Sequence, residues 1–432
     1  MDRQGFKRLK IQGWRQFHAI DIEVHPRLTI ITGANGAGKS TILSFLTRHF
    51  GYNRDFLATP QTKSGIVSFT FGIFKVIKRN LFFSGQYDAG QGTRIGEIEY
   101  ASGQQASIFL PPSQGLNYSI SIHGQQHVDG VHIDSHRPPN IYRHVSTIST
   151  ASPSSTDIGN GLNSEYMNYY SNGQINQGSL HHIKLSLIQM SIFGHGNNTM
   201  EPNPELIRLF SGFEQKLREI LPPSLGFERL VIRSPEVLLS TKSGDFLIDA
   251  ASGGVIKLIE VAWQIYFYSQ GKSGFVVTFD EPENHLHPSM QKSFLPNIMK
   301  AFPNTQIIVV THSPFIISAM RDSFVYVLRY EDTDVASDGD DQSIKGMMGS
   351  RVYAEQLDTV NKAGTASEIL RDVLGITTTI PDWAEDRVEQ IVADYQGWPM
   401  NKDTVAAIYA QLEREGLAAS YPTVLASLTR PQ

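Results

Sequence analysis

The stretch that decides the fold is Gly33-Ala34-Asn35-Gly36-Ala37-Gly38-Lys39-Ser40, which matches the pattern G-x-x-x-x-G-K-[ST] in full. A mostly apolar run at residues 28–32 precedes it and reads as a strand, and residues 40–50 read as a helix. Glycines allow such a loop to wrap so closely that its backbone N–H groups point at phosphate oxygens, and the helix adds its positive end. A chance glycine-rich turn rarely has both neighbours, so the loop predicts a phosphate-binding site.

The side chains and the backbone of this loop have separate expected roles. Lys39 supplies a mobile positive charge for the β and γ phosphates, and the Ser40 hydroxyl can ligate magnesium. The predicted cofactors are therefore ATP and Mg2+. The other residues of the loop that we expect to hold the nucleotide are Gly33, Asn35, Gly36, Ala37, Gly38 and Thr41.

A pair of carboxylates follows a second apolar run, Phe275-Val276-Val277-Thr278-Phe279. In this Walker B arrangement Asp280 would hold magnesium, usually through water, and Glu281 would polarise the attacking water. The plainer interpretation is a solvated Asp-Glu pair at the end of a strand. It becomes less probable because a further polar group, His312, follows the next strand at residues 307–310. A lone histidine is more often structural, but this order predicts that His312 contacts the γ-phosphate.

A third glycine segment, Ser252-Gly253-Gly254, stands directly before an expected helix at residues 255–268. Backbone N–H groups at the start of a helix bind anions, which is one interpretation of the segment. The plainer interpretation is an ordinary helix cap with serine as the capping residue.

The remaining pattern predicts an α/β fold with a mixed sheet. Strands alternate with helices from residue 255 to 330, which favours parallel strands covered on both faces. Short, often alternating runs at residues 65–147 indicate antiparallel strands. We interpret residues 148–178, rich in Ser, Asn and Gly, as a long loop, and the chain after Tyr353 as several short helices.

These patterns suggest two regions. We expect residues 1–330 to form one ATPase domain around the phosphate loop and the carboxylate pair, with an antiparallel β-rich insertion at about residues 81–178. Residues 331–432 form a C-terminal helical region, in which we expect partner or oligomer contacts.

Composition narrows the class of protein. The chain has 432 residues, a net charge of −5 and no cysteine, which excludes disulfides and cysteine-based sites. We find no signal peptide and no run of about 18 apolar residues, so we expect a cytoplasmic protein that does not cross a membrane. The acidic balance gives no general reason to bind DNA.

The order of the motifs resembles that of the ABC-type ATPases of the SMC, RecF and OLD group, over residues 1 to about 330. The resemblance implies that Ser252, Gly253 and Gly254 bind the γ-phosphate held by the opposite subunit; Ala251 and Val255 depart from the family's signature motif. Trp14-Arg15-Gln16-Phe17 looks like the family's Asn-Phe-Arg segment, which implies a nucleotide contact for Arg15 although the residue order differs. For the family's glutamine loop the open candidates are Gln61, Gln86, Gln104 and Gln114.

Glu283-Asn284-His285-Leu286-His287-Pro288 looks more specifically like the OLD-type ATPases of bacterial anti-phage systems. Those proteins carry a TOPRIM nuclease domain after the ATPase, but here only Asp332-Thr333-Asp334 matches it, and superficially. His285 and His287 could suggest a metal site, although packing is the more probable role for them.

The whole chain therefore resembles a standalone ATPase, similar to the ATPase subunits of the two-component PARIS phage-defence systems. This resemblance implies a homo-oligomer with ATP at its subunit interfaces, a separately encoded TOPRIM-type nuclease as effector, and a phage trigger protein. The alternatives are a RecF- or SMC-like DNA repair ATPase, a transporter ATPase subunit, and a Septu-type ATPase paired with an HNH nuclease.

Overall fold

The computed structural model describes residues 5–63, 66–70, 87–88, 92–111, 116–331, 351–357, 366–374 and 381–429. The chain divides into two compact units, Met1–Gly364 and Thr365–Gln432. None of the described helices is long and apolar enough to cross a membrane.

The centre of the first unit is a parallel part of the main sheet, with the strand order β18, β3, β17, β16, β12. These strands are β3 (Leu28–Gly33), β12 (Gly130–Ile133), β16 (Phe275–Asp280), β17 (Thr305–Val310) and β18 (Phe324–Glu331). Every residue of β3, β16 and β17 is buried, as expected for parallel strands covered on both faces. Parallel strands end at the same edge, so the segments that follow β3, β16 and β17 meet there.

An antiparallel part extends the same sheet beyond β18. The strand β19 (Arg351–Gln356) joins the two parts, because it pairs antiparallel with β18 and parallel with β2. The sheet then continues through β1, β8, β9 and β11. The bounds are β1 (Phe6–Trp14), β2 (Phe17–Glu23), β8 (Gly92–Tyr100), β9 (Gln105–Leu110) and β11 (Ser121–His123). The predicted α/β class with a mixed sheet is thus confirmed. The expected antiparallel insertion was partly wrong: β8, β9 and β11 are members of the main sheet, and β12 pairs parallel with β16 because it lies at the edge of the parallel part.

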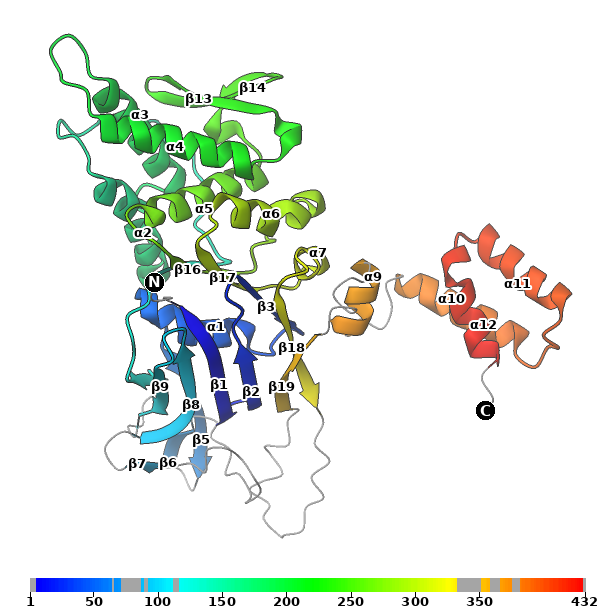
Figure 1. The fold of residues 1–432 in the computed structure, drawn as a ribbon. Helices are drawn as coiled ribbons and strands as arrows, with labels where there is room; N and C mark the ends of the chain where they lie inside the picture. The colour runs from blue at the N-terminus through cyan, green and yellow to red at the C-terminus, as the bar shows by residue number, and fades with distance from the viewer. Residues whose placement is uncertain are drawn as a thin grey trace. The chain divides into compact units, whose positions relative to one another are not determined.

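Smaller pieces of sheet complete the described strands. They are β4 (Phe56–Leu57) with β10 (Asn117–Tyr118), β5 (Thr59–Lys63) with β6 (Ile66–Thr70), β7 (Tyr87–Asp88) beside β8, and the meander β13 (Phe227–Arg233), β14 (Glu236–Thr241) and β15 (Gly244–Leu247). Helices surround the parallel part: α1 (Lys39–Thr47), α2 (Ser155–Asn172), α3 (Ser179–His195), α4 (Pro204–Ile220), α5 (Gly253–Ser269), α6 (Pro288–Ala301) and the short α7 (Pro314–Ile317). Some of them pack on other helices: α2, α3 and α4 contact α5, whereas α1 lies directly against the parallel strands. In Figure 1, α3 and α4 lie at the opposite end of this unit from β5 and β6.

Two local expectations were wrong. Much of residues 148–178, expected as a loop, is the helix α2, whose start is fixed by a capping box between Ser154 and Asp157. Its apolar stripe is only Ile158, Leu162 and Tyr166, spaced by four residues and buried, so the many Asn and Ser residues on its other faces hid the helical period. The second error concerns Arg351–Gln356, which is strand β19 and not helix, because the sheet offers β2 and β18 as partners on both sides.

The second unit is helical. Its main helices are α10 (Asp382–Tyr395), α11 (Lys402–Arg414) and α12 (Tyr421–Thr429). They enclose a small core of Ala384, Val388, Ile391, Ile408, Leu412, Leu417 and Val424. The acidic segment that begins at Glu331 falls largely at residues 332–350, outside the described residues, and so does the Asp332-Thr333-Asp334 match.

Candidate nucleotide-binding and hydrolysis site

The loop between β3 and α1 has the shape that its glycines permit. Gly33 has φ +140° and Gly38 has φ +92°, which is backbone that L side chains rarely adopt. Space is short as well, since a Cβ on Gly33 would lie 2.5 Å from the Leu328 carbonyl oxygen and one on Gly38 would lie 2.4 Å from the Phe17 ring. Both glycines are therefore required by conformation and by packing.

Lys39 folds back over this loop. Its Nζ donates to the carbonyl oxygens of Gly33 and Ala34, both at 3.0 Å, and the residue is 6% exposed. Burial lowers the pKa of Lys39, while the nearby Glu281 and Asp280 carboxylates act in the opposite direction. Both hydrogen-bond partners are neutral, so the ammonium group can exchange them for anionic oxygens at a gain in electrostatic energy.

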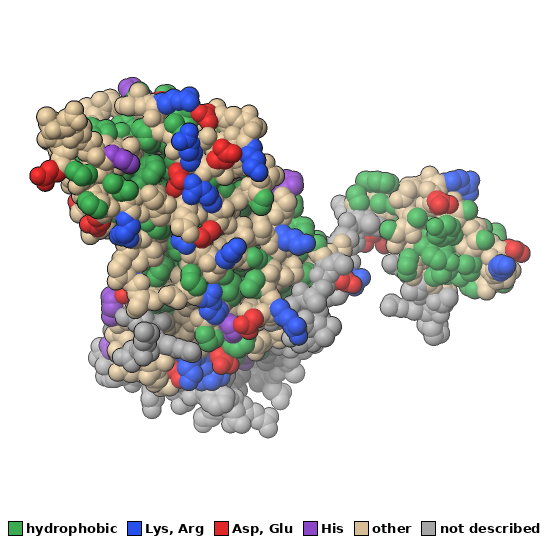
Figure 2. Space-filling model, turned by 45° about the horizontal axis from the view of Figure 1, so that its top comes forward, with side chains coloured by type: hydrophobic (Ala, Val, Ile, Leu, Met, Phe, Trp, Pro, Cys, Tyr) green, Lys and Arg blue, Asp and Glu red, His purple; other side chains and the backbone are tan. Residues whose placement is uncertain are grey.

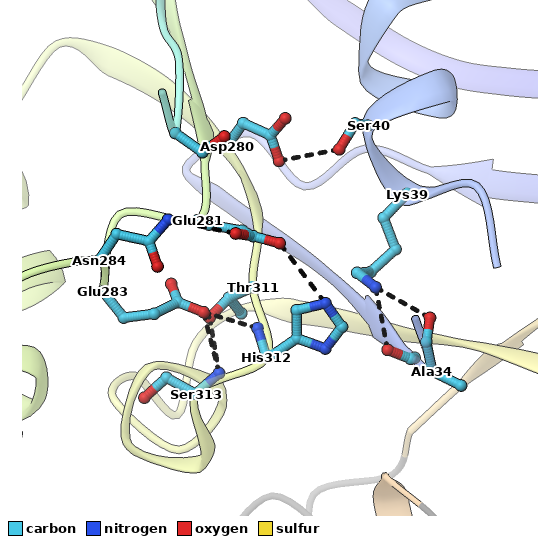
Figure 3. A network of polar contacts seen from close by, with 12 residues as sticks. Ala34, Lys39, Ser40, Asp280, Glu281, Glu283, Asn284, Thr311, His312 and Ser313 are labelled. Carbon is cyan, nitrogen blue, oxygen red and sulfur yellow. Dashed lines mark hydrogen bonds and ion pairs between the residues drawn. The ribbon is translucent and has the colours of Figure 1, made fainter. Parts of the chain in front are cut away.

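Ser40 and Asp280 connect the loop to the end of β16. The Ser40 hydroxyl donates to Asp280 Oδ1 at 3.1 Å (Figure 3). Burial raises the pKa of Asp280, the hydrogen bond from Ser40 and the nearby His132 lower it, and Asp134 and Glu281 raise it further. A buried carboxylate among other carboxylates is a site that a cation would stabilise.

Glu281 follows directly and has a strained backbone, with φ +46°. Its N–H donates to the Val310 carbonyl oxygen at 2.8 Å, and its Oε2 accepts from Asn284 Nδ2 at 3.2 Å. Its other oxygen, Oε1, lies 3.5 Å from Nε2 of His312. Both side chains remain about one-third exposed, so the pair faces accessible space.

His312 is held at the end of β17 with its ring toward Glu281, as Figure 3 shows. Burial lowers the pKa of His312, the positive charge of Lys39 lowers it further, and Glu281 acts in the opposite direction. The imidazole is thus favoured in its neutral form, in which one ring nitrogen donates and the other accepts.

Glu283 is a site residue to which the sequence analysis gave no role of its own. Its Oε1 accepts from Thr311 Oγ1 at 2.7 Å, from His312 N at 2.7 Å and from Ser313 N at 3.2 Å. The turn that presents His312 is therefore built on a carboxylate from the segment after β16. The sequence shows that Glu283 lies two residues after Glu281. It does not show that the Glu283 carboxylate binds the backbone of His312, which is 29 residues further along the chain.

Polar residues at the end of β12 form another contact that the sequence analysis missed. His132 Nδ1 lies 2.9 Å from Thr278 Oγ1, its Nε2 lies 3.8 Å from Asp134 Oδ2, and Arg54 pairs with the same carboxylate. Burial opposes ionisation of Asp134, but His132 and Arg54 hold its pKa at about 2. A narrow cleft lies between this cluster and the loop helix, lined by Ser40, Leu43, Ser44, Thr47, Tyr52, Arg54, His132 and Asp280.

Arg15 lies in an aromatic setting and not against the phosphate loop. Its Nε donates to the Tyr118 hydroxyl at 3.2 Å, and its guanidinium lies 5.0 Å from the ring centroids of both Trp14 and Phe56. The residue of this segment that reaches the loop is Gln16, whose Nε2 donates to the Gly36 carbonyl oxygen at 3.3 Å. A nucleotide contact for Arg15 stays a prediction.

Ser252 caps helix α5, because its hydroxyl oxygen accepts from Val255 N at 3.4 Å. Ser252 and Gly253 are both exposed, so the start of this helix is open to solvent. Its expected contact with a nucleotide on a second subunit stays a prediction. His287, one of the two histidines after the carboxylates, caps α6 by accepting from Ser289 N at 3.3 Å.

The structure does not identify which of the four candidate glutamines forms the glutamine loop. Gln104 is exposed beside the turn between β8 and β9, and Gln61 lies on β5 opposite Ser68. Gln86 and Gln114 are outside the described residues.

Comparison with protein families gives two matches along the chain. Residues 8–221 match a family model described as an AAA domain. Residues 138–318 match another, described as an AAA domain, putative AbiEii toxin, Type IV TA system. The first contains the phosphate loop, and the second contains Ser252 and the carboxylates with His312. This chain is a P-loop ATPase. Its sheet carries the phosphate loop, the paired carboxylates and His312 at the ends of β3, β16 and β17, within the predicted α/β fold with a mixed sheet.

The ATPase has relatives among characterised proteins at low identity. It is 23% identical to the Septu protein PtuA of Bacillus thuringiensis over 393 residues, which cover 86% of this chain and 85% of that one. A segment of 54 residues is 39% identical to a retron Ec83 probable ATPase of Escherichia coli and spans 12% of this chain and 10% of that one.

The ATPase is also similar to solved SMC heads. The SMC head domain from Thermotoga maritima aligns with 82% of this chain and 99% of its own length, at 12% identity and a TM-score of 0.42. An SmcHead bound to the C-winged helix domain of ScpA aligns with 82% and 99%, at 17% identity and a TM-score of 0.40.

Proposed function

We propose that this ATPase is the switch subunit of a bacterial anti-phage defence complex. In this proposal it binds and hydrolyses ATP as a homo-oligomer and holds a separately encoded nuclease until a phage trigger protein is detected. The observation that carries the catalytic part is the convergence of Lys39, Ser40, Asp280, Glu281 and His312 at one edge of the sheet. The defence part is supported by the similarity to Septu PtuA across 86% of the chain.

The residues fit ATP with Mg2+. Ser40 and Asp280 bring a hydroxyl and a buried carboxylate within 3.1 Å of each other, and hard oxygen donors of this kind are what Mg2+ prefers. When bound, the ion neutralises charge on the β and γ phosphates. Lys39 would exchange its two carbonyl partners for phosphate oxygens, and the backbone from Gly33 to Thr41 would surround them.

Glu281 is the proposed group that orients and deprotonates the attacking water. Its strained backbone and its contacts with Asn284 and His312 fix its direction before the nucleotide arrives. The neutral His312 would then donate a hydrogen bond to the γ-phosphate, and Glu283 keeps its backbone in place. In this way the presence of the γ-phosphate is transmitted to the end of β17.

The site is proposed to be completed by a second copy of the chain. Ser252, Gly253 and Gly254 would meet the γ-phosphate held by the partner, and the exposure of Ser252 and Gly253 at the start of α5 leaves this segment available for it. An isolated monomer would therefore hydrolyse ATP poorly, and hydrolysis would report assembly.

The proposal also concerns the class of nuclease that acts as the effector. The resemblance to PARIS ATPase subunits favours a TOPRIM-type nuclease, and the similarity to Septu PtuA favours an HNH nuclease as the alternative. A RecF- or SMC-like role in DNA repair is the alternative outside defence, and it requires salt-sensitive binding of DNA by the purified ATPase.

The test is a phage challenge of cells that express the ATPase together with the product of the adjacent gene. We expect the wild-type pair to protect the cells and the Lys39→Ala variant to lose this protection. The control is Lys300→Ala, at an exposed position near the end of α6, which should protect as well as wild type. Equal survival with and without the pair, across phages of several families, would contradict a defence role, while DNA-damage sensitivity of a deletion strain would favour repair.

A further inference from the structure

The C-terminal unit holds the whole net charge of the chain. Residues 365–432 contain five Lys or Arg and ten Asp or Glu, which gives a net charge of −5, and the full chain has the same net charge of −5. Residues 1–364 are therefore neutral overall. The excess of acidic over basic groups therefore lies in the smaller compact unit, which has a core of its own.

The helix α10 divides its residues sharply between core and solvent. Ala384, Val388 and Ile391 face the core of the unit. On the opposite side Asp386, Glu389 and Asp394 are exposed, at the helical spacing of three to four residues or its multiples. Arg387 is the single basic residue in the sequence of this helix, and its guanidinium is turned to Glu415 by hydrogen bonds of 2.6 and 2.7 Å. Its charge also reaches Asp394, but the helix carries five carboxylates against this one guanidinium, so its exposed side is negatively charged overall.

Large apolar side chains stand at both ends of this acidic face. Trp383 begins it and is 65% exposed, while Trp398 and Met400 follow the helix and are 57% and 38% exposed. Figure 2 shows a group of hydrophobic side chains on the visible surface of this unit, with acidic and some basic side chains around it. Trp398 contacts the Tyr395 ring, with 5.4 Å between the centroids, but both tryptophans keep more than half of their surface exposed. Tryptophan is among the residues that are enriched where binding energy is concentrated at protein interfaces.

We propose that this surface, made by Trp383, Asp386, Glu389, Asp394, Trp398 and Met400, docks a cationic face of the separately encoded nuclease. This rests on the proposed function and names the contact that the effector would use. The helix α10 has 14 residues and is therefore about 21 Å long, which spaces the two apolar anchors at the scale of one interface. The carboxylates between them steer and orient a basic partner.

The negative charge of this surface argues against the other common classes of binding partner. Nucleic acid and anionic lipid surfaces are repelled by a face with this excess of carboxylates, and so is the same acidic face of a second copy. A nuclease, in contrast, must present Lys and Arg to the phosphates of its DNA. If that face is the one that docks, the acidic surface competes with DNA, and the effector is inactive for as long as it is bound.

The experiment measures binding of the full-length ATPase to the purified product of the adjacent gene. The test variant is Asp386→Lys with Glu389→Lys on α10. The matched control is Asp403→Lys with Glu413→Lys, which makes the same charge change at exposed positions of α11. We expect binding at least about tenfold weaker for the test variant and within about twofold of wild type for the control. Trp383→Ala should weaken binding by about 30-fold or more, the scale of a dominant interface residue.

Two further readouts distinguish docking at this surface from a contact elsewhere on the chain. ATP turnover should be unchanged in all variants, and a short DNA duplex should displace the ATPase from the nuclease. Tight binding of the nuclease by the α10 and Trp383 variants would overturn the surface and leave the proposed function standing. A wild-type chain that binds no such protein would overturn both. An altered oligomeric state of the α10 variants, with nuclease binding intact, would mean that the face joins copies of this chain, and would also overturn the proposal.

Discussion

Glu283 holds the backbone of His312: its Oε1 accepts the His312 N–H at 2.7 Å, across 29 residues of sequence. The same oxygen accepts from Thr311 and Ser313, so three donors of one turn depend on a single carboxylate. The histidine that faces Glu281 is therefore placed by the segment that follows β16, and the two halves of the candidate site are mechanically linked.

Substitution of Glu283 should consequently reduce turnover more than nucleotide binding. Glu283→Ala removes an acceptor of several hydrogen bonds to a charged group, each worth about 1.5–3 kcal/mol, and we expect kcat to fall by roughly 10- to 100-fold. Glu283→Gln keeps one acceptor oxygen and should lie between Ala and wild type. Steady-state kcat and KM for ATP measure this, with His287→Ala, a nearby exposed helix cap, as the control. A higher KM with kcat unchanged would show that Glu283 does not position the turn for catalysis.

Lys39→Ala and Glu281→Gln should fail at different steps. The first removes the charge that we assign to the phosphates, so nucleotide binding should weaken by at least about tenfold. The second keeps size and hydrogen bonding to Asn284 but loses the base, so it should bind ATP and turn over about 100-fold or more slowly. Equilibrium binding of a fluorescent ATP analogue and phosphate release distinguish the two. Wild-type values in either variant would remove that residue from its assigned role.

Ser252 permits a test of subunit sharing that leaves the helix cap intact. Aspartate caps helices as well as serine does, so Ser252→Asp should leave the melting temperature almost unchanged. If Ser252 meets a γ-phosphate of the partner subunit, the added negative charge should abolish most ATP turnover, whereas Ser252→Thr should retain it. Turnover by Ser252→Asp at the wild-type rate would show that this residue only caps its own helix.

Mixing two inactive variants tests the same interface directly. Lys39→Ala and Ser252→Asp subunits should each be inactive alone, and a mixture should regain part of the activity, because some mixed interfaces combine an intact loop with an intact serine. A mixture with no more activity than its components would contradict a shared site, provided that size-exclusion chromatography shows that the subunits exchange.

Stability should fall in mildly acidic solution because of His49. Burial lowers the pKa of His49 to about 4, against a partial opposing effect of the Leu46 and Phe45 carbonyl groups. Between pH 6.5 and about 4 the unfolded chain therefore binds a proton that the folded chain does not. The free energy of unfolding then decreases as pH falls through this window, by about 1–3 kcal/mol. Urea unfolding at about pH 7 and about pH 5 measures it, and His49→Gln should lose this part of the difference; an equal difference in the variant would assign it to other groups.

Part of the candidate site could be predicted because its chemistry is local. The phosphate loop is defined by glycine spacing, and the structure requires those glycines at Gly33 and Gly38 for backbone angles and for space. Asp280 and His312 could be expected at one edge because each follows a buried strand, and parallel strands end together.

Other features of the fold and the site could not be predicted from the sequence. Glu283 acts on a turn 29 residues further along the chain, and only the fold shows that the Gln16 side chain reaches the carbonyl oxygen of Gly36. The helix α2 was missed since its apolar stripe is narrow, and β19 was missed because its strand state depends on two neighbours in the sheet.

The sequence by itself determined the phosphate loop, the carboxylate pair and the alternating α/β architecture. These depend on residue type and spacing along the chain. Only the tertiary structure decided that Glu283 holds His312, that Asp134 and His132 lie beside the loop helix, and that the carboxylates of α10 face solvent between exposed apolar side chains. Such relationships are set by strand order and helix packing, which bring together residues that the chain separates.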